Sequence, residues 1–131
     1  MKEDQQRQQE LMFKLQIFEQ QIRHLQEQYQ AVEQAITQTA SLMFGLDDLK
    51  GGKGKEIMAS IGKGIFVKAK IESDDLIVDV GDKNFVKKDI DSTQKLIKGQ
   101  IEKLEEIKKE LEENMDKLNG ELTDVFTEAQ E

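Results

Sequence analysis

Hydrophobic residues recur at alternating steps of four and three in two long stretches, one near each end of the chain. The first series comprises Leu11, Leu15, Phe18, Ile22, Leu25, Tyr29, Val32, Ile36 and Met43, interrupted only by Thr39. The second comprises Ile90, Ile97, Ile101, Leu104, Leu111, Met115, Leu118, Leu122 and Val125. Such a repeat is typical of coiled-coil helices. The pattern predicts two long helices, and the absence of proline leaves both uninterrupted.

The segment between these helices follows a different pattern. After the glycine-rich loop 51–55, four short stretches have β character, at residues 56–61, 64–71, 76–80 and 84–88. Turn-forming residues separate them, so we expect two successive β-hairpins. Residues 91–94, Asp-Ser-Thr-Gln, have the order of a capping box that opens the second helix. We therefore divide one domain, 1–131, into a helix over 1–44, a linker and hairpins over 45–90, and a helix over 91–131.

The helices are expected to pair antiparallel, which places Met43 near Gln94 and Leu11 near Val125. Polar residues at seam positions, Gln94 and Lys108, are expected to specify the register. The hairpins keep an apolar face that no helix is left to cover, and isolated hairpins are marginal in water. We expect this face to join other chains in a β-built body with projecting arms. The predicted oligomer interface is Ile65, Val67, Ala69, Ile71, Leu76, Val78 and Val80.

Charge is concentrated in the second helix. The net charge of the chain is −8, of which residues 91–131 contribute −6. Nucleic-acid binding is disfavoured, because affinity for phosphates requires clustered Lys and Arg. The chain has no cysteine, and neither a signal peptide nor a membrane span is predicted. We expect a cytoplasmic protein that does not bind membranes.

Candidate catalytic groups are few. The loop 51–55 lacks the spacing of a phosphate-binding loop and is read as a linker. His24 is the sole histidine and lies off the seam, so no catalytic triad can be assembled. We predict no catalytic residue, no metal site and no cofactor, and conclude that the chain is not an enzyme.

The hairpin segments resemble a known family. Residues 61–71, IGKGIFVKAKI, and 76–86, LIVDVGDKNFV, are similar to the paired hairpins of α-class subunits of prefoldin, a hexameric archaeal and eukaryotic co-chaperone. The resemblance covers essentially the whole chain and is greatest to archaeal members. It implies a mainly α fold, an antiparallel coiled-coil hairpin whose two β-hairpins form an oligomeric β-barrel platform. It also implies a hetero-hexamer with prefoldin beta subunits, two alpha and four beta. Its arms would hold unfolded polypeptides and pass them to a group II chaperonin without ATP hydrolysis.

The predicted client-binding residues lie where the two helices end. They are the seam residues Leu11, Leu122 and Val125 with the off-seam residues Met12, Phe13, Ile17 and Phe126. Exposed Phe and Met form adaptable apolar surface, which suits varied partners. The alternative is that these residues only complete the end of the coiled coil.

Two other functions remain open. The rod could be a structural adaptor or scaffold whose ends have one specific partner. It could also be a coiled-coil finger that enters RNA polymerase, as in transcript-cleavage factors. The latter fits poorly, because such fingers place acidic residues at the turn between the helices, whereas here the acids lie at the chain termini.

Overall fold

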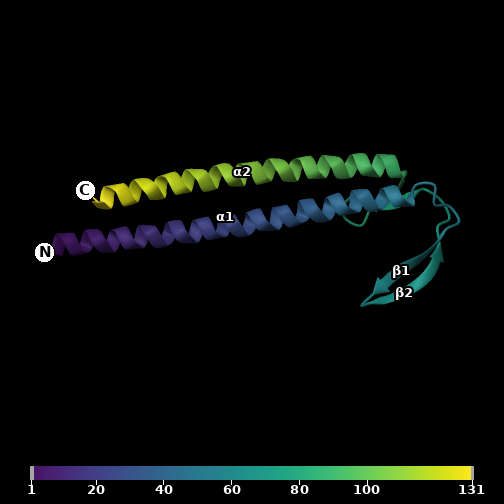
Figure 1. Cartoon of the computed structure of the whole chain (residues 1–131), viewed down its shortest axis with the longest axis horizontal. Coiled ribbons are helices and arrows are strands. Elements are labelled where there is room, and N and C mark those ends of the chain that lie inside the picture. Colours follow the sequence, from purple (N-terminus) through teal and green to yellow (C-terminus); the bar gives the residue numbers. More distant parts are fainter. Residues whose placement is uncertain (1, 131) are drawn as a thin grey trace. The chain divides into compact units, whose positions relative to one another are not determined.

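The computed structural model describes residues 2–130, and side chains as far as residue 128. It contains two long helices, α1 (Lys2–Leu49) and α2 (Ile90–Gln130) (Figure 1). Between them lie four strands, β1 (Glu56–Gly62), β2 (Ile65–Lys70), β3 (Leu76–Asp79) and β4 (Phe85–Lys88). The predicted fold of two long helices joined by two β-hairpins is confirmed.

Contacts within the chain define two units. The helical unit combines α1 up to Ile36 with α2 from Lys103 onward, and the hairpin unit spans residues 37–102. In the helical unit the two helices lie side by side and run in opposite directions (Figure 1). Every apolar seam residue predicted for this unit is half-buried or buried, and Leu111 is the most buried of those described. The heptad pattern therefore selects the sides of α1 and α2 that meet.

A small apolar core holds the hairpin unit together. Leu46, Ile90 and Ile97 are buried, and the half-buried Met43, Leu49, Leu76 and Ile101 pack against them. Residues from α1, β3 and α2 thus share one cluster. The first strand of the second hairpin is joined to the helices through Leu76.

The first helix is longer than the sequence pattern predicted, since it continues to Leu49 instead of ending near Phe44. Leu46 is buried in the extra turn, and burial of a leucine contributes roughly 1.5–3 kcal/mol. That gain exceeds the cost of about 1 kcal/mol for Gly45 inside a helix. The helix ends where Gly51 adopts a left-handed φ of 67°, a conformation that favours glycine.

The second helix is capped by Asp89, so the predicted capping box at residues 91–94 was wrong. The Asp89 Oδ1 atom accepts a hydrogen bond of 2.7 Å from the Ser92 N–H group. The Thr93 hydroxyl donates to the Asp89 carbonyl oxygen at 2.8 Å. Because the buried Ile90 is already helical, the helix has to start before Asp91.

Both predicted hairpins are present as separate two-stranded antiparallel sheets. In β1–β2, Ile57 lies opposite Ala69 and Ala59 lies opposite Val67, so these four side chains share one face. The turn 62–64 has positive φ at all three residues, which its two glycines tolerate. In β3–β4, Val78 lies opposite Val86. The outer edge of each strand has no strand partner within the described residues.

Candidate functional site

The seven residues predicted for client binding fall into two groups in the helical unit. The seam residues are half-buried, namely Leu11, Leu122 and Val125. The off-seam residues are exposed, namely Met12 (62%), Phe13 (64%), Ile17 (39%) and Phe126 (51%). The exposed group does not pack into the seam of its own chain. Large apolar side chains are therefore open to solvent near the N-terminal end of α1 and the C-terminal end of α2.

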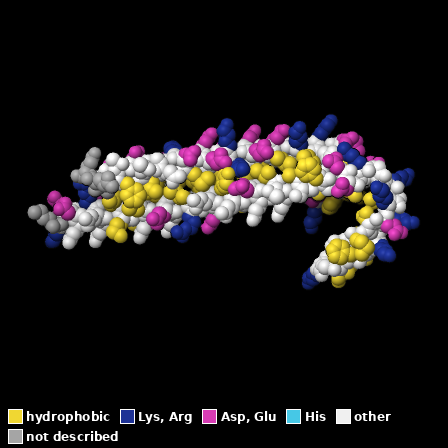
Figure 2. Space-filling model, in the orientation of Figure 1, with side chains coloured by type: hydrophobic (Ala, Val, Ile, Leu, Met, Phe, Trp, Pro, Cys, Tyr) yellow, Lys and Arg dark blue, Asp and Glu magenta, His cyan; other side chains and the backbone are white. Residues whose placement is uncertain are grey.

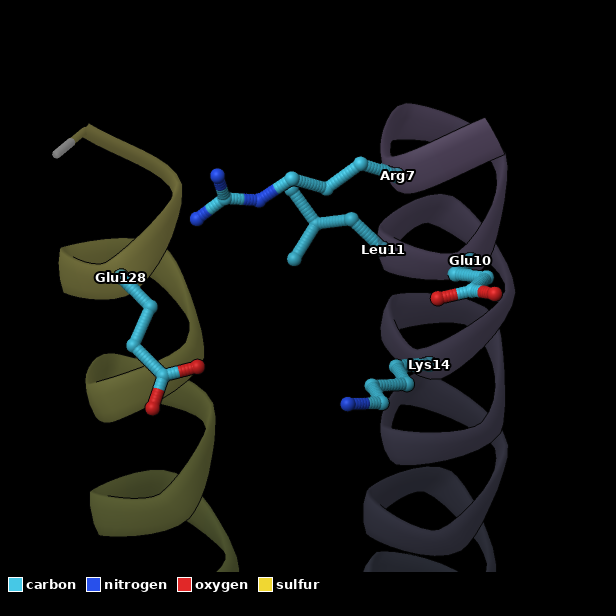
Figure 3. Close-up of a pocket in the computed structure, with 5 residues that line it drawn as sticks. All are labelled: Arg7, Glu10, Leu11, Lys14 and Glu128. Carbon is cyan, nitrogen blue, oxygen red and sulfur yellow. The ribbon is translucent and has the colours of Figure 1, made fainter. Parts of the chain in front are cut away.

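A shallow hollow of about 180 Å³ lies between the two helices close to these residues. In Figure 3, Arg7, Leu11 and Lys14 extend from α1 toward α2, and Glu128 extends from α2 toward α1. Arg7 and Lys14 were not among the residues predicted from the sequence, in which the acids of the second helix were the prominent charges. Their spacing was a usable signal, because steps of four and three place Arg7, Leu11 and Lys14 on one face. The hollow thus combines an apolar residue with charges of both signs.

Polar contacts cross the seam in the middle of the helical unit. The Tyr29 hydroxyl donates a hydrogen bond of 2.9 Å to the Glu112 carboxylate. The Lys108 Nζ atom lies 5.4 Å from the centre of the Tyr29 ring, within the range of a cation–π contact. The hydrogen bond to Glu112 raises the pKa of Tyr29 above its usual value. These contacts join specific turns of α1 and α2.

A second polar group joins the helices within the hairpin unit. The Gln94 side-chain amide donates to the Met43 carbonyl oxygen at 3.2 Å and to the Asp47 carboxylate at 2.7 Å. The Lys50 ammonium lies 3.0 Å from Asp91 and 3.3 Å from Asp47. The bond from Gln94, followed by that from Lys50, lowers the pKa of Asp47. Hydrogen bonds to Asp91 and then Asp47 raise the pKa of Lys50. Gln94 and Lys50 both tie the end of α1 to the start of α2.

The residues predicted for the oligomer interface differ in how exposed they are within their own chain. The exposed members are Ile65, Val67 and Val80, and the half-buried members are Ala69, Ile71, Leu76 and Val78. Leu76 packs on the core of the hairpin unit. Ile71 and Leu76 also line a hollow of about 330 Å³, whose wall contains both apolar residues and the polar segment 72–75. Val67 and its neighbours are therefore the part of this set most available to another chain.

Several exposed apolar residues of the hairpins were missed from the sequence. They are Ile57, Met58, Ile61, Phe66, Ile77 and Phe85. Ile77 is 77% exposed, and it lies opposite Lys87 on the face of β3–β4 away from Leu76. Figure 2 shows hydrophobic atoms open to solvent on the hairpin β1–β2 as well as along the line where the helices meet. Both faces of each hairpin thus carry apolar side chains, which the alternation within single strands did not indicate.

Groups with potential for chemistry are not assembled in the described part of the chain. The His24 ring nitrogen Nε2 lies 3.2 Å from the Gln28 amide nitrogen one turn further along α1. Among residues 2–130, no three His, Cys, Asp or Glu side chains lie close enough together to bind a metal ion. None of the described helices combines the length and the apolar character needed to cross a membrane.

The family model and the relatives that match this chain agree on one family. The family model described as Prefoldin subunit matches residues 18–131. The chain is 32% identical to prefoldin subunit alpha of Methanobrevibacter smithii over 124 residues, which are 94% of this chain and 80% of that protein. It is 30% identical to prefoldin subunit alpha of Pyrobaculum arsenaticum over 95 residues, 72% of this chain and 69% of that protein.

The fold also matches a solved structure. Filamentous PFD from Methanocaldococcus jannaschii, determined by cryo-electron microscopy, superposes with a TM-score of 0.78. The match covers 86% of this chain and 95% of that chain at 24% sequence identity. At this level of identity the likeness concerns the fold.

Proposed function

The chain belongs to the prefoldin family, in its α class, and on that premise we propose that it is an ATP-independent holdase. A chaperone-type role within a multi-subunit prefoldin complex follows from family membership. The chain captures unfolded or nascent polypeptides near the ends of its helices and delivers them to a group II chaperonin. It works in the cytoplasm, in a hexamer of two alpha and four beta prefoldin subunits, and uses no cofactor.

One observation carries this proposal. Met12, Phe13 and Phe126 are more than half exposed, although they belong to helices whose seam residues are covered. Their exposure contributes nothing to the coiled coil of the chain itself. A non-native polypeptide offers apolar segments of varied shape, and flexible Met and planar Phe side chains suit such partners.

The charges near these residues have a role of their own in the proposal. From Glu110 onward the chain has eight carboxylates and only Lys117 as a base, a net charge of −7. Carboxylates attract basic stretches of a client and keep empty arms apart through repulsion. Each contact is weak, and binding strengthens when several arms engage one client, because linked contacts raise the effective concentration.

The first test replaces the exposed phenylalanines. The double variant Phe13→Ser, Phe126→Ser should weaken suppression of client aggregation. Aggregation is measured by light scattering, without nucleotide, on the chain assembled with a β-type subunit.

Removing residues 1–17 and 121–131 should abolish suppression of aggregation while the oligomer stays assembled. Ile107→Ser is the matched control, since Ile107 is 44% exposed on α2 but lies away from the helix ends.

Three outcomes would contradict the proposal. Full protection by the truncated oligomer would place client binding elsewhere in the molecule, such as on the β platform. An equal loss in Ile107→Ser would show that exposed apolar area matters irrespective of position. A chain that protects no client in any assembly, yet binds one partner protein tightly, would act as a structural adaptor.

A further inference from the structure

One side of the helical unit has residues that flank the seam at a spacing of seven on both helices. On α1 these residues are Arg7, Lys14 and Gln21, and on α2 they are Asn114, Glu121 and Glu128. Arg7, Lys14 and Glu128 line the hollow of about 180 Å³, and the other three line a second hollow of about 360 Å³. A spacing of seven keeps residues on one side of a coiled-coil helix. The two hollows therefore lie in line, and together we call them the lateral groove.

Apolar seam residues line the lateral groove and are only half-buried. Leu11 lines the first hollow, and Leu25 and Leu118 line the second. In a pair of helices a seam residue is covered by the partner helix alone, so part of its surface stays open. A third helix laid in the groove would cover that surface, because its side chains can fill the spaces between seam residues. Such removal of apolar area from water is favourable.

The spacing of the lateral groove suits a helix better than an extended segment. Seven residues of an α-helix advance by about 10.5 Å, so a helix with a heptad pattern repeats over the same distance as the groove. Side chains on one face of an extended chain recur about every 6.6–6.8 Å, and they do not stay aligned with the groove. Unfolded chains retain fluctuating helices, so a client can present a helical segment.

The two sides of the lateral groove carry charges of opposite sign. The flanking positions of α1 include the bases Arg7 and Lys14, whereas those of α2 include the acids Glu121 and Glu128. Figure 3 shows Arg7 and Lys14 extending from α1 toward α2, and Glu128 extending from α2 toward α1. Within the described residues, none of these four side chains forms an ion pair. All four charges are therefore available to a bound segment.

Two further charges line the hollows, Glu10 on α1 and Lys117 on α2. The heptad period places each of them farther from the seam than the flanking positions. In coiled coils it is the charges at the flanking positions that determine which helix pairs and in which orientation. The lateral groove is therefore complementary to a helix that has acids along one edge of its apolar stripe and bases along the other.

We propose that the lateral groove binds an amphipathic helix of a client, with acids beside Arg7 and Lys14 and bases beside Glu121 and Glu128. This inference rests on the proposed holdase function and adds a class of client segment, one that is already helical. It also predicts the direction of the bound helix. Turning the helix end to end exchanges the edges that face α1 and α2, so only one direction places unlike charges together.

Synthetic peptides three heptads long test the groove on the full chain assembled with a β-type subunit, by fluorescence anisotropy. The matched peptide has leucine along its stripe, glutamate along one edge and lysine along the other. It should bind about fivefold more tightly than a peptide of the same composition in which glutamate and lysine alternate along both edges. Equal binding of these two would overturn the proposal. So would unchanged binding of a matched peptide whose helix is broken by a central proline.

Energy transfer measures the direction of the bound helix. The chain has no cysteine, so one acceptor can be attached at Gln9→Cys or at Gln30→Cys. These exposed positions lie three heptads apart on α1, about 31 Å. The donor is at the N-terminus of the matched peptide or of a peptide with the two charged edges exchanged. One peptide should transfer more strongly to position 9 and the other to position 30, and the same preference in both would contradict the assignment of the charges.

Charge reversal tests the same contacts from the side of the protein. Arg7→Glu with Lys14→Glu should weaken binding of the matched peptide about fivefold, and Glu121→Lys with Glu128→Lys should do the same. The variant with all four substitutions should bind the matched peptide as the wild type does, but in the opposite direction. If this variant keeps wild-type helicity by circular dichroism yet binds weakly, the proposal is wrong.

The control variant is Arg23→Glu with Lys109→Glu. It makes the same change in charge as reversal of the two α1 bases, but neither residue lines the lateral groove. Binding of the matched peptide should be unaltered in this variant. An equal loss would attribute the effect to the net charge of the arm and would contradict a site in the groove.

Aggregation suppression separates this inference from the holdase proposal. The charge-reversed variants should still protect an all-β client, which offers no helical segment. Wild-type chain that protects such a client but does not bind the matched peptide would contradict the helix site and leave the holdase function in place. Wild-type chain that binds the peptide in the expected direction but protects no client would support the groove and contradict the holdase function.

Discussion

Polar residues determine how the apolar surfaces of this chain align. Tyr29, Lys108 and Glu112 connect the helices in the helical unit, and Gln94 reaches both Met43 and Asp47 in the hairpin unit. Each is partly exposed, so its contribution to stability is small. A polar contact across a seam nevertheless disfavours shifted registers, because a shift leaves its groups without their partners. We therefore expect these residues to affect the choice of register more than stability.

Replacement of Asp89 tests the cap of α2. Asp89→Ala should lower the melting temperature at pH 7, because the Ser92 N–H group loses its acceptor. The hydrogen bond from Ser92 holds the pKa of Asp89 below its usual value. The contribution of the charged cap is therefore fully present above the unfolded-state pKa of about 3.9 and is lost as the pH falls through the lower folded-state value.

Melting curves recorded by circular dichroism between pH 7 and pH 3 measure this pH dependence of the cap. The difference between wild type and Asp89→Ala should shrink at the acidic end. Asp89→Asn is the control, because Asn also caps helices but carries no charge, so its difference from Asp89→Ala should not change with pH. A constant difference between wild type and Asp89→Ala would show that the cap charge has no effect.

Helix propensity falls along α2 toward its C-terminal end. The stretch from Gln100 to Leu118 consists largely of strong helix formers, whereas Asn119, Gly120, Thr123 and Thr127 follow within a few residues of one another. The Thr123 and Thr127 hydroxyls donate to carbonyl oxygens one turn earlier, a contact that slightly weakens helices. The last turns of the helix described are therefore the least stable, and they carry Leu122 and Phe126.

Replacement of Gly120 tests this local weakness. An alanine Cβ at this position would meet no atom within 4 Å, so Gly120→Ala should raise the free energy of unfolding by about 1 kcal/mol. Gly51→Ala is the counterpart. A Cβ at Gly51 would also meet no atom within 4 Å, but the residue has a φ of 67°, which favours glycine. It should destabilise the chain by about 1 kcal/mol. Urea unfolding followed by circular dichroism gives both values, and a shift of the same sign in the two variants would contradict the backbone explanation.

For the molecule as a whole, assembly depends on surfaces that the chain leaves open. The described helices cover each other along the seam, whereas Val67 on β2 remains 45% exposed. The hairpin unit has its own core of Leu46, Ile90 and Ile97, so the fold of the chain does not require Val67. Assembly and folding can therefore be disturbed separately.

Val67→Asp should break the oligomer and leave far-UV helicity largely unchanged. A carboxylate placed in an apolar contact without a partner is costly, but in the separated chain this side chain stays in water. Val67→Thr is the control, because it keeps the branched shape without a charge. Sedimentation measures the size of the oligomer, and circular dichroism of the same samples measures helicity. Loss of helicity together with the oligomer would mean that the arms need the platform in order to fold.

The order of residues was enough to predict the two helices, their seam and the existence of two hairpins. Burial along a helix has a period close to 3.5 and burial along a strand has a period of two, so both can be read from the order of residues. The off-seam position of Phe13 and Phe126, and with it their exposure, followed from the same periodicity. Family resemblance in residues 61–86 added the chaperone-type role, which no spacing implies.

Other features depend on which distant residues meet, and these became visible only in the folded chain. The α1 helix continues to Leu49, and α2 is capped by Asp89. Both follow from the core of the hairpin unit, because burial of Leu46 and Ile90 outweighs local capping preference. Strand register placed Ile57 and Ala59 beside Val67, which alternation within one strand cannot reveal. Leu76, one of the residues predicted for the oligomer interface, is half-buried against the core of the hairpin unit, a contact between distant residues that the strand pattern cannot reveal.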